Sequence, residues 1–307
     1  MHDQPLDLPS GVIRRLIDHL GDQAHEWLHG APDRLAGVAA RWRVNVSGYH
    51  DAGWTSVVAA GRDSVGRPVI IKLLPETERF RQERATLEHW AGAGVCRLLA
   101  ADEDAQALLI ESVTEIPGGA MRPPDHVERV AAAIHRLHQQ LVRADIGCPV
   151  PLLTDYYLNE VVSRISQRAV HWGKVVGPAQ VDCALALCRD LCAGKRPLAM
   201  LHADLYSENV LFNEQGDPVF IDPHPKIGSA AFDWAFWCVY YVPTAGFEER
   251  VELCRHHTPC DMDEVLAWVL TLAVDGALYY LDTKDATADA MLAVLDSPVL
   301  VSLLRTG

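Results

Sequence analysis

Residues 198–223, LAMLHADLYSENVLFNEQGDPVFIDP, combine two apolar runs with a polar loop whose side chains could do chemistry. The loop holds His202, Asp204 and Asn209, and Asp222 follows the second apolar run. A carboxylate can orient or deprotonate a hydroxyl group, and an amide oxygen with a second carboxylate can hold Mg²⁺, which prefers hard oxygen ligands. Phosphoryl transfer needs these groups, because a protein catalyses it mainly by positioning the reactants and compensating their charge.

A cation for nucleotide phosphates comes earlier in the chain. Lys72 lies in VIIKLL, an apolar run rich in β-branched residues that predicts a strand, and Glu83 lies on the helix predicted to follow. Taken singly, each polar residue has an ordinary structural explanation, such as a turn carboxylate or a lysine at a sheet edge. In combination, the order Lys72, Glu83, His202-x-Asp204-x4-Asn209 and Asp222 has the spacing of kinase catalytic groups.

Two motifs carry a family resemblance. LHADLYSENVLF and VFIDPHPKIGSAAFDWAFW resemble the aminoglycoside phosphotransferase family, whose members have a kinase-like fold and phosphorylate hydroxyl groups of small molecules. The phrase IDPHPKIG…AFD, together with ERATLEHWAGAGVCRLLAAD, is most similar to the streptomycin and hydroxyurea phosphotransferase subgroup. The resemblance covers about residues 40 to 240.

The resemblance implies roles for the residues of the catalytic loop. Asp204 is expected to be the catalytic base, with His202 in the same catalytic motif, and Asn209 and Asp222 are expected to hold Mg²⁺. Asp233 also matches a family position, where it is expected to be a structural carboxylate that braces the loop.

The resemblance also implies a nucleotide site for ATP, although GTP is not distinguished from ATP by these motifs. Lys72 is expected to contact the phosphates, Glu83 to orient Lys72, and the backbone from Glu111 to Val113 to receive the adenine.

Two positions depart from the family pattern. Ala203 stands where the family usually has Gly, which we expect to stiffen the loop without removing a ligand. The loop SGYHDAGW, residues 47–54, lacks the G-x-G-x-x-G phosphate cover. Its candidate nucleotide contacts are therefore Gly53, Thr55 and Ser56.

A buried charge is predicted in the segment DEVLAWVLTLAVDGALYYLD. Asp275 shares one helical face with the neutral residues Val265, Trp268, Leu272 and Tyr279. A buried carboxylate needs a partner. The partner is either an Arg or backbone group of the fold, or a guanidinium or ammonium group of a bound substrate.

Two further segments have alternative explanations. Trp234, Trp237 and Tyr241 share a helical face, which is expected to pack in the core or, alternatively, to form a choline-kinase-like aromatic cage for a quaternary ammonium group. The segment CRHHTPC, residues 254–260, is a weak zinc-site alternative, because it has neither a second half nor a Cys-x-x-Cys knuckle.

Composition limits the class of protein. Apolar residues make up 49% of 307 residues, enough for a sizeable core, and 41 acidic against 27 basic residues argue against a nucleic-acid partner. The start MHDQPLDLPSG lacks the pattern of a secretory signal, and the apolar stretch VLAWVLTLAV is about half the length needed to span a bilayer. We therefore expect a cytoplasmic protein without a membrane partner.

The elements expected around the loop predict an α+β, bilobal, protein-kinase-like fold. A small β-rich nucleotide-binding lobe is expected at 1–113 and a larger, mainly helical catalytic and substrate-binding lobe at 114–307. The predicted elements of the first lobe are a helix at 11–29, strands at 41–49, 54–62 and 69–74, a helix at 76–92 and a hairpin at 95–113. After a Pro/Gly connector at 116–124, helices are expected at 126–141 and 159–170, and a small hairpin after the loop.

These observations predict Mg²⁺-dependent transfer of the γ-phosphoryl group of ATP to a hydroxyl group of a small cationic molecule. The resemblance favours an aminoglycoside antibiotic of the streptomycin type, inactivated by phosphorylation. One alternative is a metabolic kinase for an amino alcohol or a sugar derivative. Another is an inactive nucleotide-binding regulator, which the intact set of Lys72, Asp204, Asn209 and Asp222 disfavours. The oligomeric state is left open.

Overall fold

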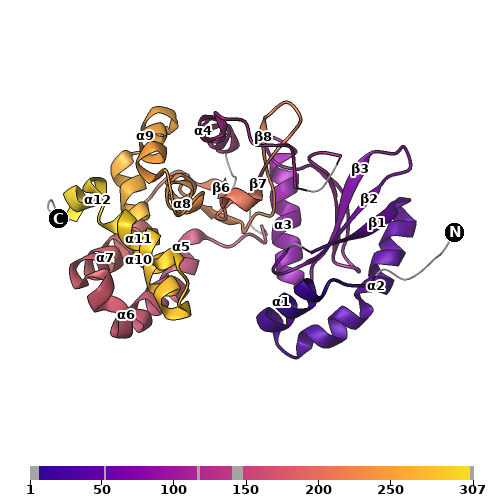
Figure 1. The fold of residues 1–307 in the computed structure, drawn as a ribbon, viewed down its shortest axis with the longest axis horizontal. Helices are drawn as coiled ribbons and strands as arrows, with labels where there is room; N and C mark the ends of the chain where they lie inside the picture. Colours follow the sequence, from indigo (N-terminus) through magenta and orange to yellow (C-terminus); the bar gives the residue numbers. More distant parts are fainter. Residues whose placement is uncertain (1–6, 52, 116–117, 140–147, 305–307) are drawn as a thin grey trace. The chain divides into compact units, whose positions relative to one another are not determined.

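The computed structural model describes residues 7–51, 53–115, 118–139 and 148–304. They form two compact units, one rich in strands and one mainly helical, which confirms the predicted α+β fold with two lobes (Figure 1). The first unit comprises Met1–Pro123 and Leu211–Ile221, and the second comprises Pro124–Val210 and Asp222–Gly307. Relative to the predicted lobes 1–113 and 114–307, residues 114–123 and 211–221 belong to the first unit.

The first unit is built on one antiparallel sheet of five strands in the order β1-β2-β3-β5-β4. The strands are β1 (Asn45–His50), β2 (Val57–Arg62), β3 (Pro68–Leu73), β4 (Leu98–Asp102) and β5 (Ala107–Glu111). The helices of this unit are α1 (Ser10–Leu20), α2 (Gln23–Trp42) and α3 (Thr77–Trp90).

Alternation along β3 decides which of its side chains reach which helix. Successive side chains of a strand point to opposite faces of the sheet. Val69, Ile71 and Leu73 are buried in one core cluster with apolar residues of α1 and α2. Lys72 therefore points to the other face, where it meets Glu83 of α3.

The N-terminal segment differs from the prediction of one helix at 11–29. Helix α1 ends at Leu20, and Gly21 follows with a φ of +65°, a conformation that glycine adopts without steric cost. Helix α2 then extends from Gln23 to Trp42. Arg43, which follows it, also has a left-handed backbone conformation. The strand predicted at 41–49 consequently begins only at Asn45.

A two-stranded hairpin from the second half of the sequence belongs to the first unit. It consists of β7 (Val210–Phe212) and β8 (Pro218–Phe220), which confirms the hairpin predicted after the loop. The backbone of Phe220 donates to the carbonyl of Gly94 at 2.9 Å and accepts from the N–H of Cys96 at 3.0 Å. The backbone carbonyl of Phe212 accepts from Ala120 at 2.7 Å. These hydrogen bonds attach the hairpin to residues 94–120.

The second unit is mainly helical, and its described elements include a small sheet. Its helices are α4 (His126–Leu137), α5 (Leu153–Tyr156), the π-helix η1 (Tyr157–Val161), α6 (Val162–Val176), α7 (Pro178–Ala193), α8 (Ala231–Tyr240), α9 (Phe247–His257), α10 (Met262–Thr283), α11 (Thr287–Leu295) and α12 (Pro298–Leu304). The predicted helix at 126–141 ends at Leu137, and its residues 140–141 lie outside the described residues, as do residue 52 of the predicted phosphate loop and residues 116–117 of the predicted connector.

Helix α10 is the central helix of this unit and packs against α6, α7, α8 and α11. Among the described residues it alone is long and apolar enough to cross a membrane, but 78% of its most apolar window is buried within the protein. That burial is typical of a core helix. The apolar stretch noted in the sequence is thus part of a longer helix of 22 residues.

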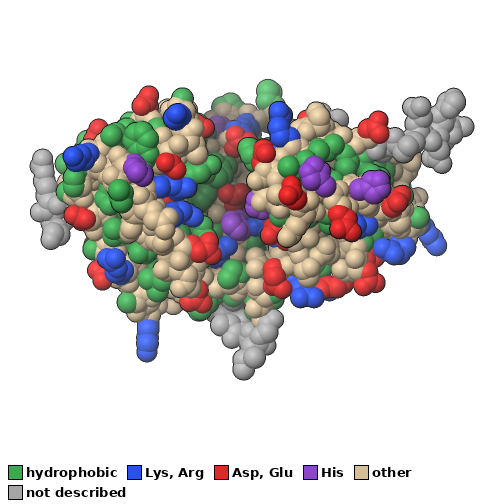
Figure 2. Space-filling view, turned by 90° about the horizontal axis from the view of Figure 1, so that it is seen from below, with side chains coloured by type: hydrophobic (Ala, Val, Ile, Leu, Met, Phe, Trp, Pro, Cys, Tyr) green, Lys and Arg blue, Asp and Glu red, His purple; other side chains and the backbone are tan. Residues whose placement is uncertain are grey.

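The surface carries charges of both signs. On the face shown in Figure 2, acidic and basic side chains are interspersed over both units. The formal net charge of the whole chain is −14.

Candidate active site

The polar loop starts where a short pair of strands ends. Strand β6 (Ala199–Leu201) pairs antiparallel with β9 (Lys226–Gly228), and Leu201 lies opposite Lys226. The loop then runs from His202 to the short 3₁₀-helix η2 (Ser207–Asn209). The N–H of Ser207 donates to the carbonyl of Tyr241 at 3.0 Å, which fixes the end of the loop.

Asp233, in the first turn of α8, braces the start of this loop, as the resemblance predicts. Its carboxylate is fully buried and accepts hydrogen bonds from the backbone N–H groups of His202 and Ala203, both at 2.8 Å. The ring of His138, which directly follows α4, lies 2.9 Å from the same carboxylate. Asp233 thus accepts hydrogen bonds from backbone N–H groups at the start of the loop and fixes the loop conformation there.

His202 is also fully buried, and its backbone carbonyl accepts from the N–H of His224 at 2.9 Å. These contacts give His202 a place in the support of the loop. Its assignment to the catalytic group remains a prediction.

Two residues of the site have left-handed backbones. Ala203 has a φ of +55° and Asp222 has a φ of +54°, a region that costs a non-glycine residue roughly 1–2 kcal/mol. Such strain is concentrated at functional sites, where the surrounding structure maintains it. The value at Ala203 gives a physical reason for the glycine that the family usually has there.

Asn209 is held against Asp204. Its amide nitrogen donates to the backbone carbonyl of Asp204 at 2.9 Å and to the Asp204 carboxylate at 2.8 Å. An amide that donates through its nitrogen can coordinate a cation only through its oxygen. Together with the carboxylate of Asp222, this donor set consists of hard oxygen atoms and fits Mg²⁺.

The predicted nucleotide residues Lys72 and Glu83 meet within the first unit. The Lys72 Nζ lies 2.8 and 2.7 Å from the two carboxylate oxygens of Glu83. Both residues are buried, with 4% and 1% of their surface exposed. A buried pair with this geometry holds the ammonium group in one orientation, which is the role predicted for Glu83.

The predicted phosphate loop is held by a helix that sequence reasoning did not connect with it. The Arg15 Nε of α1 donates to the carbonyl of Gly53 at 2.9 Å, and the Arg15 Nη2 donates to Asp51 at 2.8 Å. Gly53 has a φ of +96°, and Ser56 beside it is buried. The nucleotide contacts predicted for Ser56, Gly53 and Thr55 stay predictions.

The segment expected to receive the adenine lies at the end of β5. The backbone N–H of Glu111 donates to the carbonyl of Arg97 at 2.9 Å, and its carboxylate pairs with the Arg97 side chain at 2.9 Å. These contacts fix the backbone at Glu111. The adenine site from Glu111 to Val113 stays a prediction.

A cavity of about 290 Å³ in the second unit is lined by Asp204 and by Asp275, the residue considered as a substrate ligand in the sequence analysis. Aromatic rings form much of its wall, and they come from the loop and from four helical segments: Tyr156, Tyr157, Tyr206, Phe232, Phe236, Tyr240, Tyr279 and Tyr280. Sequence reasoning missed this set, because its members are dispersed along the chain. The helical spacing of Phe232, Phe236 and Tyr240 was the one local signal for it.

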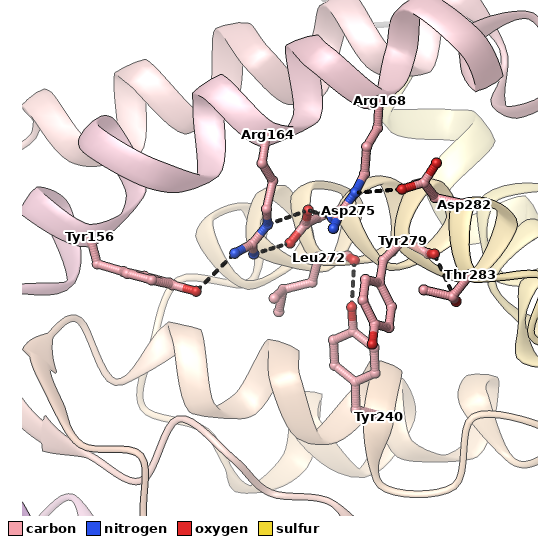
Figure 3. Close-up of polar contacts among 9 residues, drawn as sticks. All are labelled: Tyr156, Arg164, Arg168, Tyr240, Leu272, Asp275, Tyr279, Asp282 and Thr283. Carbon is pink, nitrogen blue, oxygen red and sulfur yellow. Dashed lines mark hydrogen bonds and ion pairs between the residues drawn. The ribbon is translucent and has the colours of Figure 1, made fainter. Parts of the chain in front are cut away.

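Asp275 borders this cavity and has a partner within the fold. Arg164 of α6 donates to it through two nitrogens, with an Nε–Oδ1 distance of 2.9 Å and a second, Nη2–Oδ2 hydrogen bond (Figure 3). Arg168 lies 3.8 Å from the same carboxylate. Asp275 therefore pairs with an Arg of the helical unit, as the first alternative of the sequence analysis predicted, and it also lies at the cavity. Its predicted role as a cation ligand of the substrate is weakened, because Arg164 already neutralises it.

Burial affects the phenol groups of Tyr206 and Tyr240 in the cavity wall. Burial raises the pKa of Tyr206 and Tyr240, and the Asp275 carboxylate raises the pKa of Tyr240 further. The Tyr240 hydroxyl donates to the carbonyl of Leu272 at 2.9 Å. The wall thus contributes neutral phenol groups to the site.

The aromatic cage alternative is wrong for the residues named in the sequence analysis. Trp234, Trp237 and Tyr241 are each fully buried and pack against one another in the core. Their ring faces are therefore closed to a ligand.

The zinc alternative also finds no support in the part of the chain that the structure describes, which includes all of residues 254–260. There, no group of three His, Cys, Asp or Glu side chains could hold a metal ion. His257 instead lies 2.7 Å from Glu128, and the His256 ring lies 2.8 Å from the carbonyl of Glu252.

The two units, the braced loop and the Lys72–Glu83 pair define a kinase-like phosphotransferase. A sequence profile of the aminoglycoside/hydroxyurea antibiotic resistance kinases matches residues 41–283, and the chain belongs to this family. This confirms the predicted family. It also makes the chain an enzyme that transfers a phosphoryl group to an alcohol acceptor, and the fold implies ATP with a divalent metal ion.

Relatives with a named activity share about a quarter of their residues with this chain. The chain is similar to a hydroxyurea phosphotransferase from Kitasatospora aureofaciens, with 25% identity over 286 residues, covering 89% of this chain and 80% of that protein. It is also similar to a streptomycin 6-kinase from Streptomyces griseus, with 24% identity over 306 residues, covering 95% and 97% of the two chains. The aminoglycoside phosphotransferase APH(4)-Ia shares the fold, with a TM-score of 0.59 and 16% identity over 90% of this chain and 99% of that one.

Proposed function

We propose that this protein uses Mg²⁺ and ATP to phosphorylate a hydroxyl group of an aminoglycoside of the streptomycin type and thereby inactivates it. The observation that carries the proposal is the cavity of about 290 Å³, whose wall contains Asp204 itself. A carboxylate in the wall of an aromatic-lined pocket is suited to meet the hydroxyl group of a bound small molecule.

The residues of the site divide the work. Asn209 and Asp222 would hold Mg²⁺, which when bound neutralises phosphate charge. Lys72, oriented by Glu83, would contact the nucleotide phosphates. Asp204 would orient the acceptor hydroxyl and accept its proton, while Asp233 keeps the loop in shape.

The size of the cavity limits the acceptor. Ligand pockets commonly have volumes of about 300–1,000 Å³, so this cavity encloses a small acceptor or one ring of a larger one. Its charged side chains are the cations Arg164, Arg168 and Lys226 and the anions Asp204 and Asp275. Because these charges nearly balance, neutral hydroxyurea is a second candidate acceptor beside the cationic aminoglycoside.

The test uses the purified protein with Mg-ATP and measures ADP release together with phosphate transfer to each acceptor. The panel contains streptomycin, other aminoglycosides, hydroxyurea, an amino alcohol and a neutral sugar. We expect transfer to streptomycin or hydroxyurea and resistance to the same compound in a sensitive bacterium that expresses the protein. Transfer only to the amino alcohol or the sugar would favour a metabolic kinase.

An inactive nucleotide-binding regulator would transfer phosphate to none of these acceptors. Cells that express Asp204→Asn at the same level serve as the control, because that variant lacks the proposed base. Recovery of the active protein from the cytosol would support the expected cytoplasmic location.

A further inference from the structure

The cavity contains a buried lysine to which none of the predicted roles applies. Lys226 lies on β9 directly opposite Leu201, the last residue of β6 before the catalytic loop. It is 4% exposed, and it lines the same cavity as Asp204. The pairing of two short strands therefore brings its ammonium group to the acceptor side of the loop.

The surroundings of Lys226 hold its side-chain nitrogen in place. Its Nζ lies 3.2 Å from the carbonyl of Pro225 and 3.5 Å from the carbonyl of His224. It also lies 5.1 Å from the ring centroid of Tyr156, within the range of a cation–π interaction. A desolvated cation has stronger electrostatic interactions than one in water, so its effect on a bound acceptor is large.

Two arginines also line the cavity, and both contact carboxylates of α10. Arg164 forms the bidentate pair with Asp275, and Arg168 lies between Asp275 at 3.8 Å and Asp282 at 3.7 Å (Figure 3). The loop itself, HADLYSEN, contains no Lys or Arg. A positive charge on the acceptor side of Asp204 must therefore come from another element, and β9 provides it.

We propose that Lys226 is a catalytic residue of the acceptor site, whose ammonium group donates a hydrogen bond to the acceptor oxygen that attacks the phosphorus. This inference rests on the proposed function. In the step, the acceptor O–H bond breaks and its proton goes to Asp204, while the new O–P bond forms. The bond from the γ-phosphorus to its bridging oxygen breaks, and its electron pair leaves with ADP. Lys226 keeps its proton and stabilises the negative charge that develops on the attacking oxygen.

Steady-state kinetics of Lys226→Met, with Lys174→Met as the matched control, test the inference. Lys174 is an exposed lysine of α6 that does not line the cavity, so its variant should behave like the wild type. For Lys226→Met we expect kcat/KM for the acceptor to fall on the order of 10²-fold, as when one transition-state hydrogen-bond donor is removed. The KM for ATP should stay within about twofold, since the lysine acts on the acceptor oxygen.

A second variant separates this role from a structural one. Lys226→Ala opens space beside the cavity, so added ethylamine should restore part of the turnover, whereas sodium chloride at equal ionic strength should not. Unchanged acceptor kinetics in Lys226→Met, equal losses for ATP and acceptor, or no recovery with ethylamine in a folded Lys226→Ala variant would each overturn the inference. If the wild type phosphorylates no acceptor of the panel, the proposed function fails and this inference fails with it.

Discussion

Asp204 and Asp222 are both carboxylates of the candidate site, and the proposed function gives them different tasks. Asp204 is held by the amide of Asn209 at 2.8 Å and lines the acceptor cavity. Asp222 has a left-handed backbone directly before Pro223. The first setting suits a group that meets the acceptor, and the second suits a fixed metal ligand.

Substitution of each carboxylate tests this division at the residue scale. Asp204→Asn should lower turnover by roughly 10²-fold or more, the usual worth of a positioned base, with the affinity for Mg-ATP nearly unchanged. Asp222→Ala should abolish turnover and also weaken Mg-ATP binding, because the metal loses a charged ligand. Calorimetric titration of Mg-ATP into both variants is the measurement, and equal losses of affinity would contradict the assignment.

The backbone strain at Ala203 leads to a second prediction. Ala203→Gly relieves a left-handed conformation that costs roughly 1–2 kcal/mol, but glycine adds about 0.4–1 kcal/mol of unfolded-state entropy. We expect the free energy of unfolding to stay equal or to rise by up to about 1 kcal/mol, with activity retained. Ala169→Gly in the interior of α6 is the control and should lose about 1 kcal/mol. Similar losses in both variants, measured by denaturant titration, would show that Ala203 is unstrained.

Local spacing is what made part of the site predictable. Asp204 and Asn209 lie five residues apart, and their contact is a property of one short loop. Arg164 and Asp275 are 111 residues apart, and their pairing depends on how α6 packs against α10. No pattern in one sequence encodes such a contact, which is why Asp275 had two alternatives until the fold was known.

At the scale of secondary-structure elements, the ion pair of Arg164 and Asp275 connects α6 to α10. Removal of one partner leaves the other charge buried without compensation. Asp275→Asn and Arg164→Gln should each lower the free energy of unfolding by about 1–3 kcal/mol, a range that allows for the 34% exposure of the Arg164 side chain.

The double variant completes the cycle and should lose less than the sum of the two single losses, because the pair interacts directly. Denaturant unfolding of all four proteins gives the coupling free energy. Strict additivity would show that the pair does not stabilise the fold. An increased acceptor KM in Asp275→Asn with unchanged stability would restore the substrate-cation hypothesis.

Elements were predictable where periodicity was strong and local. The β-branched apolar run VIIKLL located β3 within one residue, and the helix after it was placed at 76–92 against an observed Thr77–Trp90. The single helix predicted at 11–29 failed because Gly21 interrupts a continuous apolar period. Periodicity reports which face is buried, whereas a helix break depends on one residue's backbone angle.

At the scale of the whole molecule, the sequence order and the spatial units do not coincide. The hairpin of β7 and β8 is encoded after residue 209 but is bonded to Gly94, Cys96 and Ala120 of the first unit. Phe220 on this hairpin is fully buried. A buried side chain from late in the sequence thus belongs to a hairpin that is bonded to the N-terminal unit.

This arrangement predicts where the structure loosens when a Phe is truncated. Phe220→Ala should lower the free energy of unfolding by about 3–5 kcal/mol and speed hydrogen exchange in β4 and β5. Phe247→Ala in α9 is the matched control, and it should speed exchange in the helices of the second unit instead. Exchange mass spectrometry of both variants is the measurement, and faster exchange of the helices in Phe220→Ala would contradict the assignment of the hairpin.

Residues of helix α8 both support the catalytic loop and line the cavity. Asp233 holds the catalytic loop, whereas Phe232, Phe236 and Tyr240 line the acceptor cavity. Selection by a new antibiotic can therefore reshape the rings of the wall while the carboxylate that shapes the loop stays unchanged. The range of acceptors can therefore change during evolution without a change in phosphoryl-transfer activity. A library that varies those three aromatic positions should yield variants that give resistance to different antibiotics and still transfer phosphate.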